Sequence, residues 1–428
     1  MKHVAEVGQL LSNGHLTECL CMLYGCQPER ADVYAKRYLQ LMEGLFTTFG
    51  SHENVALFSA PGRTEIGGNH TDHQHGCVLA AAVNIDIIAA VATNGQNVIR
   101  LKSEGYDAIA VDLNDLAKRD IEENTSTAIL RGTCKAYADR GAVLAGLDIY
   151  VSSNVPKGSG LSSSAAFEVL IGAILNDLFM PMPMDAVEIA KIGQWVENVY
   201  FGKPCGLMDQ MASSVGCAVA IDFQDPAVPI VQKVELDLND AGLALCIIDS
   251  GADHADLTDE YAAVPSDCKR VAAICGKQVL REVDYDVFLK NLTHCRQQLG
   301  DRATLRAMHF FADNQRVGKQ TQAILKKDYS TFLKLVEQSG HSSFEYLQNV
   351  IPTGATLQQS VAVAIAVAKD ALGDHGAVRV HGGGFAGTVQ AFVPMEMSDS
   401  FKKHVESVLG QHSCNMMLIR PVGGYRLV

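Results

Sequence analysis

The sequence lacks any excess of positive charge. Its 428 residues carry 35 Lys and Arg against 48 Asp and Glu, a formal net charge of −13. Nucleic-acid binding needs a basic face that neutralises phosphates, so this balance argues against a nucleic-acid partner. An acidic protein can still bind an anionic small molecule, provided that the binding groups are gathered locally.

Long apolar runs are absent as well. No segment reaches the roughly 18 consecutive apolar residues of a membrane span, and the richest run, Cys77 to Ala92, is interrupted by Asn84 and Asp86. The first residues contain no signal-peptide core or cleavage site. We therefore expect no membrane partner and a cytoplasmic location.

The cysteines form no CxxC pair. Twelve of them are scattered along the chain, which is typical of reduced, mostly buried thiols in a long cytosolic protein. Cys19 and Cys21 lie in a helical-looking segment, where a metal role is not expected.

The order of apolar patterns predicts an α+β fold with more than one domain. At roughly 100 to 200 residues per domain, this length corresponds to two or three. Residues 1–49 are expected to form a helical extension that packs on the outside, followed by strands, helices and more strands. No internal repeat or flexible linker is visible, so we place a boundary near residue 240, between firmly packed domains 1–240 and 241–428.

Two details of the strand pattern are specific enough to test. Ala218–Phe223 and Leu243–Ser250 suggest another strand pair, and Ala377–Pro394 suggests two strands around a glycine bend.

One polar stretch, Ala60 to Gly76, concentrates reactive side chains. It reads APGRTEIGGNHTDHQHG and places one arginine, two acids and three histidines in what we expect to be a loop broken by glycines.

A second stretch, Asn154 to Val169, follows a strand pattern and precedes a helix pattern. Its NVPKGSGLSSSAAFEV places glycines that allow close backbone approach before serines that can cap the helix. Free amides at a helix N-terminus bind anions. The GxxxxGK[ST] loop is absent, and a plain serine-capped helix is the competing interpretation. Three consecutive serines favour a phosphate site.

Five stretches between residues 55 and 395 carry a resemblance to the galactokinases of the GHMP kinase superfamily. PGRTEIGGNHTDHQHG resembles their sugar signature, usually GRVNLIGEHTDYNxG, and GSGLSSSAAFEV resembles the superfamily's phosphate motif. VRVHGGGFAGTVQAFV resembles its third, glycine-rich motif, with Ala386 in place of the usual glycine. WVENVYFGKPCGLMDQMASSVG and HADLTDEYAAVPSDCKRVA match galactokinases specifically.

The resemblance implies a fold and an activity. The N-terminal domain would be of the ribosomal S5 domain 2-like type and the C-terminal domain ferredoxin-like, with the active site in the cleft between them. The activity would be transfer of the ATP γ-phosphoryl group to the anomeric hydroxyl of a hexose. Small-molecule sugar and ATP are then the expected partners of a chain for which we favour a monomer.

The resemblance also assigns the reacting groups. Asp209 would be the catalytic base, since an aspartate near a sugar hydroxyl can accept its proton; Arg63 would stabilise the transferred phosphoryl and keep Asp209 ionised. Ser164 and Glu197 would hold Mg²⁺, which needs hard oxygen ligands. The residues expected to bind ATP are Gly158, Ser159, Gly160, Leu161, Ser162, Ser163, Ser164, Gly383 and Gly384, with Gly382 in the same motif.

The expected sugar contacts are Asn69, His70, Asp72, Gly206 and Tyr261. Asp72 matches a carboxylate that bridges two ring hydroxyls. Tyr261 has a competing interpretation as a partly buried core tyrosine.

Asn69 departs from the family pattern. Galactokinases usually carry a glutamate here that contacts the C6 hydroxyl, and Glu65 stands where asparagine is usual. The form HTDHQ is closer to that of galacturonate kinases. An amide tolerates a C6 carboxylate that a glutamate would repel, so galacturonate is the alternative to galactose.

Three other interpretations compete. His70, Asp72, His73 and His75 could form a Zn²⁺ site. A non-catalytic sensor of galactose and ATP is a second possibility, although the serine loop and catalytic residues are intact. Mevalonate or homoserine is a third, which the HTD and MDQ stretches argue against.

Overall fold

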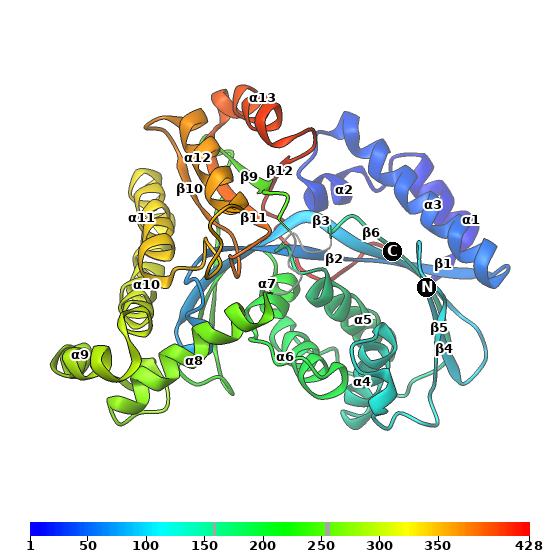
Figure 1. The fold of residues 1–428 in the computed structure, drawn as a ribbon. Coiled ribbons are helices and arrows are strands. Elements are labelled where there is room, and N and C mark those ends of the chain that lie inside the picture. The colour runs from blue at the N-terminus through cyan, green and yellow to red at the C-terminus, as the bar shows by residue number, and fades with distance from the viewer. Residues whose placement is uncertain (157–159, 253–256) are drawn as a thin grey trace.

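The computed structural model describes residues 1–156, 160–252 and 257–428. A large twisted sheet crosses the molecule, and helices lie on both of its faces (Figure 1). A smaller sheet with its own helices stands beside it. This is the α+β class that the apolar pattern predicted.

The large sheet is built around the long strands β2 and β3, which pair antiparallel. Its other strands attach on either side of this pair. The bounds are β1 Lys2–His3, β2 Asn54–Gly67, β3 Cys77–Thr93, β4 Val98–Ser103, β5 Ile109–Asp112, β6 Leu147–Ser153, β7 Ala218–Asp222, β8 Ile230–Val234 and β13 Tyr425–Arg426.

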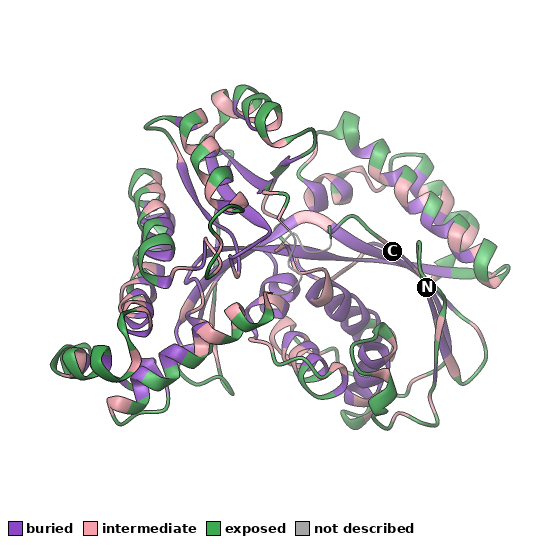
Figure 2. Cartoon of the chain, in the orientation of Figure 1, coloured by how far each residue is buried: buried purple, intermediate pink, exposed green. Residues whose placement is uncertain are grey.

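Alternation along β2 and β3 divides the core into two layers, because successive side chains of a strand point to opposite faces. Leu57 and Ile88 pack under the N-terminal helices α1 Val4–Ser12, α2 Thr17–Tyr24 and α3 Ala31–Phe49. Phe58 and Ala89 pack on the other face. The helices of that face are α4 Ser126–Asp139, α5 Ser163–Phe179, α6 Ala186–Val196 and α7 Met208–Val215. Figure 2 shows α5 buried along most of its length between its neighbours.

A buried carboxylate, Asp86 of β3, ties the N-terminal helices to the sheet. Tyr24 donates to it at 2.8 Å, and Arg37, Ser59 and Arg420 also donate to it. Burial alone would raise the pKa of Asp86, but Arg37 and Arg420 hold it below its ordinary value. The predicted helical extension therefore docks through a charged network as well as through apolar contacts.

The smaller sheet has the order β10-β11-β9-β12, with all neighbours antiparallel. Its strands are β9 Leu243–Asp249, β10 Ala377–Val380, β11 Thr388–Pro394 and β12 Cys414–Met417, and α12 Ser360–Leu372 and α13 Ser398–Leu409 pack on it. This is a ferredoxin-like arrangement. An insertion between β9 and β10 carries α8 Thr258–Ile274, α9 Tyr285–Leu299, α10 Asp301–Leu325 and α11 Tyr329–Ser342.

The two sheets are not separated cleanly along the chain. After β12, Ile419 bridges Val83 of β3, and β13 pairs with β2. The boundary near residue 240 stays a prediction, since the last residues rejoin the first sheet.

Two local predictions can be judged directly. The strand pair around the glycine bend is confirmed as β10 and β11. The pair proposed from Ala218–Phe223 and Leu243–Ser250 is wrong, because β7 lies in the large sheet and β9 in the small one.

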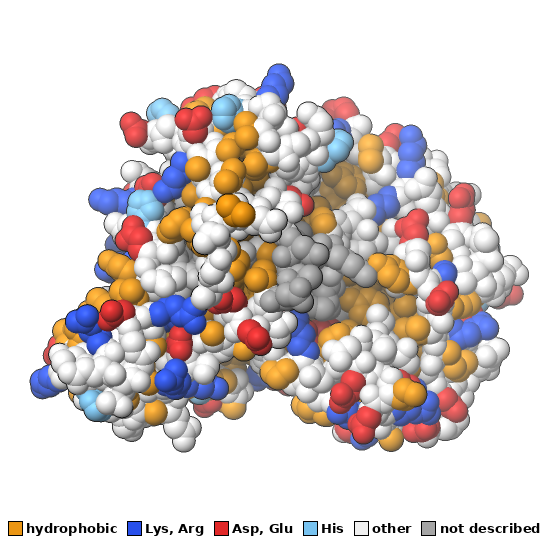
Figure 3. Space-filling model, in the orientation of Figure 1, with side chains coloured by type: hydrophobic (Ala, Val, Ile, Leu, Met, Phe, Trp, Pro, Cys, Tyr) orange, Lys and Arg blue, Asp and Glu red, His pale blue; other side chains and the backbone are white. Residues whose placement is uncertain are grey.

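The outer surface is mixed in charge. On the face shown in Figure 3, acidic and basic side chains are interspersed over the outer helices. In the part of the chain that the structure describes, no helix is long and apolar enough to cross a bilayer.

Candidate active site

Arg63 and Asp209 meet through a two-pronged ion pair. Arg63 Nε donates to Asp209 Oδ1 at 2.7 Å and Nη2 donates to Oδ2 at 2.6 Å. Ser162 Oγ donates to Oδ2 at 2.7 Å, and Arg63 Nη1 donates to the carbonyl of Gly160. The structure thus joins the two expected catalytic residues to the serine loop, although 146 positions separate them in the chain.

Local irregularities place both side chains. The stretch expected to be a loop begins as strand β2, which runs to Gly67, but its register with β3 shifts between Pro61 and Arg63 and again beyond Glu65. Such bulges re-aim a side chain out of the regular sheet. Arg63 N also donates to Leu161 O at 3.0 Å, so its backbone is bonded to the serine loop.

Asp209 lies in the first turn of α7, where the helix dipole favours a negative charge. Burial raises the pKa of Asp209, but the Arg63 guanidinium and the Ser162 hydroxyl more than offset this and hold the pKa below its ordinary value. The side chain is still 30 % exposed. The carboxylate is therefore ionised and accessible, as a proton acceptor must be.

The serines of the loop divide into two groups. Ser162 has a left-handed backbone (φ 56°) and makes no side-chain cap to α5, because its hydroxyl serves Asp209. Ser163 and Ser164 begin α5 and line a cavity of about 810 Å³. The expected ligands Gly158 and Ser159 lie outside the described residues.

This 810 Å³ cavity is large enough for a nucleotide, and most of its lining was not foreseen from the sequence. It is bordered by β4, β6, α4, α5 and the loop after β4. These segments do not belong to one sequence motif. Besides the two serines, the lining residues are Ile87, Leu101, Ser103, Glu104, Tyr106, Asp107, Ile109, Asn124, Thr125, Ser126, Thr127, Ile129, Val151, Ser153, Val155, Phe167 and Phe201.

The glycine-rich bend Gly382–Gly384 receives three of the five expected sugar-binding side chains. Asn69 Nδ2 donates to Gly382 O at 2.6 Å, His70 Nε2 to Gly383 O at 2.9 Å and Tyr261 Oη to Gly384 O at 2.7 Å. Burial chiefly lowers the pKa of His70 to about 4, so its imidazole is neutral. The glycine-rich bend thus contacts the stretch Ala60 to Gly76 directly.

Asn69 faces into the protein, which corrects the expectation that its amide lies beside a sugar. The residue is fully buried, and its Nδ2 also donates to Glu65 Oε1 at 3.0 Å. Its Oδ1 accepts from Asn349 at 2.8 Å and from Ser343 at 3.2 Å. An amide committed in this way has no group left for a ligand.

Asp72 and Gly206 lie against each other. A Cβ at Gly206 would collide with Asp72 Oδ2, so glycine is needed there for the carboxylate to keep its place. Both residues line a cavity of about 180 Å³. Asp72 Oδ1 accepts from the backbone N–H of His73 at 2.9 Å.

The groups expected to hold Mg²⁺ present suitable oxygens. Ser164 lines the 810 Å³ cavity, and Glu197 begins a π-helical turn, Glu197–Phe201, a feature often found at functional sites. A second carboxylate, Glu168, has one buried oxygen, Oε1, without a hydrogen-bond partner. A hard oxygen without a hydrogen-bond partner is a suitable ligand for Mg²⁺.

The alternative Zn²⁺ site is not supported. Among residues 1–156, 160–252 and 257–428, no three His, Cys, Asp or Glu side chains gather as a Zn²⁺ site made of such side chains requires. His70 instead bonds Gly383, and His73 Nε2 stands 3.8 Å from Asp72 Oδ1.

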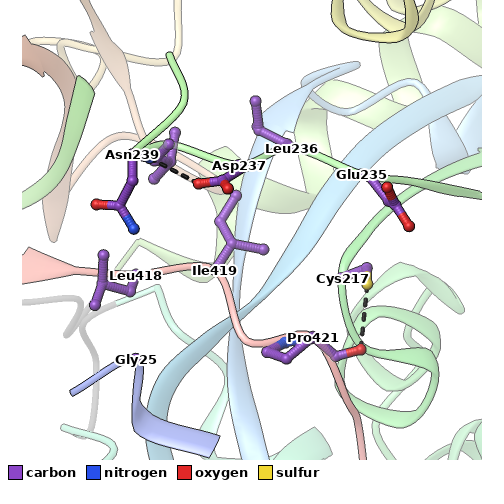
Figure 4. Close-up of a pocket in the computed structure, with 10 residues that line it drawn as sticks. Gly25, Cys217, Glu235, Leu236, Asp237, Asn239, Leu418, Ile419 and Pro421 are labelled. Atoms are coloured by element: carbon purple, nitrogen blue, oxygen red, sulfur yellow. Dashed lines mark hydrogen bonds between the residues drawn. The ribbon is translucent and has the colours of Figure 1, made fainter. Parts of the chain in front are cut away.

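A further cavity of about 360 Å³ lies elsewhere, between the N-terminal helices and the end of the chain (Figure 4). Its lining includes the acids Glu235 and Asp237 and no Lys or Arg. Cys217 Sγ contacts Pro421 O at 3.2 Å at its edge. This lining suits neither nucleotide nor phosphate.

Two family models match the segments that carry Arg63 and Asp209. Residues 45–93 match the galactokinase galactose-binding signature, and residues 127–217 match the GHMP kinases N terminal domain. A galactokinase of Streptomyces coelicolor is 31 % identical over 359 residues, 83 % of this chain and 88 % of that protein.

Solved structures share the fold. Lactococcus lactis galactokinase complexed with galactose superimposes with a TM-score of 0.77 at 23 % identity, covering 91 % of this chain and 99 % of that one. Methanococcus jannaschii mevalonate kinase gives a TM-score of 0.61 at 14 % identity, covering 87 % and 99 %. This chain belongs to the galactokinase family of the GHMP kinase superfamily.

Proposed function

We propose that the protein transfers the γ-phosphoryl group of ATP to the anomeric hydroxyl of galactose. The observation that carries the proposal is the Arg63–Asp209 pair, bonded to Ser162 and Gly160 of the serine loop. A base, a cation and a phosphate-binding helix N-terminus meet at one point, and family membership supplies the sugar class.

Each group has a defined task. Asp209 accepts the proton of the anomeric hydroxyl, which is more acidic than an ordinary alcohol, as its oxygen attacks the phosphorus. Arg63 stabilises charge on the transferred oxygens. Ser163, Ser164 and the N-terminus of α5 bind the nucleotide phosphates. Positioning and charge of this kind are the main contributors to phosphoryl-transfer catalysis.

Magnesium completes this proposal. The ion would be held by Ser164 and Glu197, and it supplies neutralisation of the nucleotide phosphate charge. We also propose a cytoplasmic location, supported by twelve cysteines that are free thiols throughout the described chain.

The buried position of Asn69 removes the argument for galacturonate, because that argument required its amide to face the sugar. None of the partners of its side chain is a cation. Arg379 is fully buried and committed to Glu65 at 2.6 Å and to the carbonyl of Ile66 at 2.6 Å. A sugar carboxylate would find no free positive charge in this network.

The test is a sugar panel. ADP release by the purified protein with MgATP is measured on galactose, galacturonate, N-acetylgalactosamine and glucose, and ³¹P NMR identifies the phosphorylated position. We expect the highest kcat/KM for galactose and a 1-phosphate product. Preference for the uronate would overturn the sugar assignment, and galactose binding without any turnover would favour a sensor.

A further inference from the structure

Two buried carboxylates share a single amide next to the catalytic aspartate. Gln210 Nε2 donates to Glu168 Oε2 at 2.9 Å and to Glu197 Oε2 at 2.8 Å. The exposed fractions of Gln210, Glu168 and Glu197 are 0 %, 1 % and 4 %. Two carboxyl groups this close to one another are unfavourable in a low-dielectric interior when both are ionised, so the amide that bridges them has a large influence on their placement.

The cluster connects three elements of the active site. Gln210 follows Asp209 in α7, and Glu168 lies one turn after Ser164 on α5, where residues four apart share a face. Glu197 begins the π-helical turn after α6. Gly193 of α6 makes room for the cluster: a Cβ there would stand 3.1 Å from Gln210 Cγ and 3.3 Å from Glu168 Oε2.

Part of the cluster is unsatisfied. Glu168 Oε1 and Gln210 Oε1 are buried without a hydrogen-bond partner. The cation that approaches is Lys203, whose Nζ is 3.6 Å from Glu197 Oε1, but its side chain is 63 % exposed, so it compensates little. Buried acceptors without partners are costly unless a further ligand reaches them.

We propose that Gln210 is a positioning residue for the metal of the metal–nucleotide complex. Its two N–H groups fix the carboxylates of Glu168 and Glu197. Glu168 in turn lies one turn from Ser164, which lines the 810 Å³ cavity. Gln210 acts through Glu197 and touches neither sugar nor nucleotide. This inference rests on the proposed function and deepens it.

The direct test replaces Gln210 by glutamate, which keeps the size but removes the donors. We expect Gln210→Glu to weaken Mn²⁺ binding to the protein with a non-hydrolysable ATP analogue by about tenfold or more, the usual effect of losing a group that orients a metal ligand. Free Mn²⁺ is measured by electron paramagnetic resonance. KM for MgATP should rise in parallel, and KM for galactose should stay within about twofold of wild type.

Two more variants keep the test sharp. Gln210→Met removes the donors without adding charge, is expected to give the same loss, and serves if Gln210→Glu does not fold. The exchange variant Glu168→Gln with Gln210→Glu restores one amide and two carboxylates, and should recover most of the Mn²⁺ affinity. Gln320→Glu, a fully buried glutamine of α10, is the matched control and should leave Mn²⁺ binding unchanged.

The outcomes separate the two proposals. A folded Gln210→Met protein whose Mn²⁺ affinity is within twofold of wild type would overturn the positioning role. Failure of the exchange variant to recover affinity would do the same. Absence of galactose phosphorylation by wild type would instead refute the proposed function, because Mn²⁺ binding with the nucleotide analogue requires no sugar.

Discussion

Removing the charge of Arg63 should change the pH dependence of catalysis as well as its rate. In the intact pair, burial raises the pKa of Asp209 while Arg63 lowers it, and the net result lies below the ordinary value of 3.8. The base works in its ionised form, so activity falls only where pH drops through this low pKa. The wild-type profile should therefore be flat down to about pH 5.

The direction of the change follows from the geometry of the pair. An opposite charge this close, with contacts of 2.6 and 2.7 Å, lowers the pKa of the Asp209 carboxyl. In Arg63→Met only the Ser162 hydroxyl remains to oppose the effect of burial, so the pKa of Asp209 should rise. The acid limb, the part of the profile where activity falls at low pH, should therefore move to higher pH. Loss of charge stabilisation should also lower kcat by about 10²–10³.

The assay is steady-state ADP release from pH 4.5 to 8.5 at constant ionic strength and saturating MgATP. Arg63→Lys is the control, since it keeps a positive charge without the two-pronged geometry and should shift the limb less. An acid limb that stays at its wild-type position in folded Arg63→Met would show that Arg63 does not set the ionisation of Asp209.

Three further changes test other parts of the site. Asp209→Asn should lower turnover about 10²–10⁴-fold while galactose still raises the melting temperature; loss of that thermal shift would indicate a role in binding instead. Gly206→Ala should displace the Asp72 carboxylate and raise KM for galactose about tenfold at unchanged KM for ATP, whereas Gly318→Ala, which points into open space, should change neither; an unaltered galactose KM in Gly206→Ala contradicts the packing argument. Burial raises the pKa of Glu65 to about 7, so its protonated form stabilises the fold and this contribution is lost as pH rises from 4.5 to 7. Relative to Glu65→Gln, the free energy of unfolding of wild type, measured in urea, should fall by about 3 kcal/mol between pH 4.5 and 7. If the free energies of unfolding of the two proteins change with pH in parallel, the pKa assigned to Glu65 is refuted.

The meeting of the two candidate catalytic residues was predictable from sequence because short motifs carry them. Arg63 and Asp209 each occur inside a stretch whose neighbours match the family, and the fold brings the two stretches together as that match implies. The α+β class followed from the order of the apolar patterns, and in β2 and β3 successive side chains enter two different buried clusters.

The partners of individual side chains were not predictable. Whether Asn69 faces a ligand or the interior depends on Asn349 and Ser343, which are 280 and 274 positions away. The sequence predicted that Ser162 can cap a helix. In the structure Ser162 has a left-handed backbone and its hydroxyl donates to Asp209 instead. No local pattern encodes such choices.

The 810 Å³ cavity and Gln210 were missed for a related reason. The cavity takes a few residues from each of several strands and helices, and none of these segments is unusual by itself. In the sequence, Gln210 is only the last residue of the MDQ stretch. In the structure, Glu168 and Glu197 from two other helices accept hydrogen bonds from its amide.

The return of the chain to β2 and β3 has a consequence for biosynthesis. Strand β13 and Ile419 fill their places in the large sheet only after the ferredoxin-like layer has been made. During translation, the first 240 residues must therefore wait with an unpaired edge beside Ser59 and with Asp86 lacking Arg420. Completion of the large sheet therefore depends on the last residues to be synthesised.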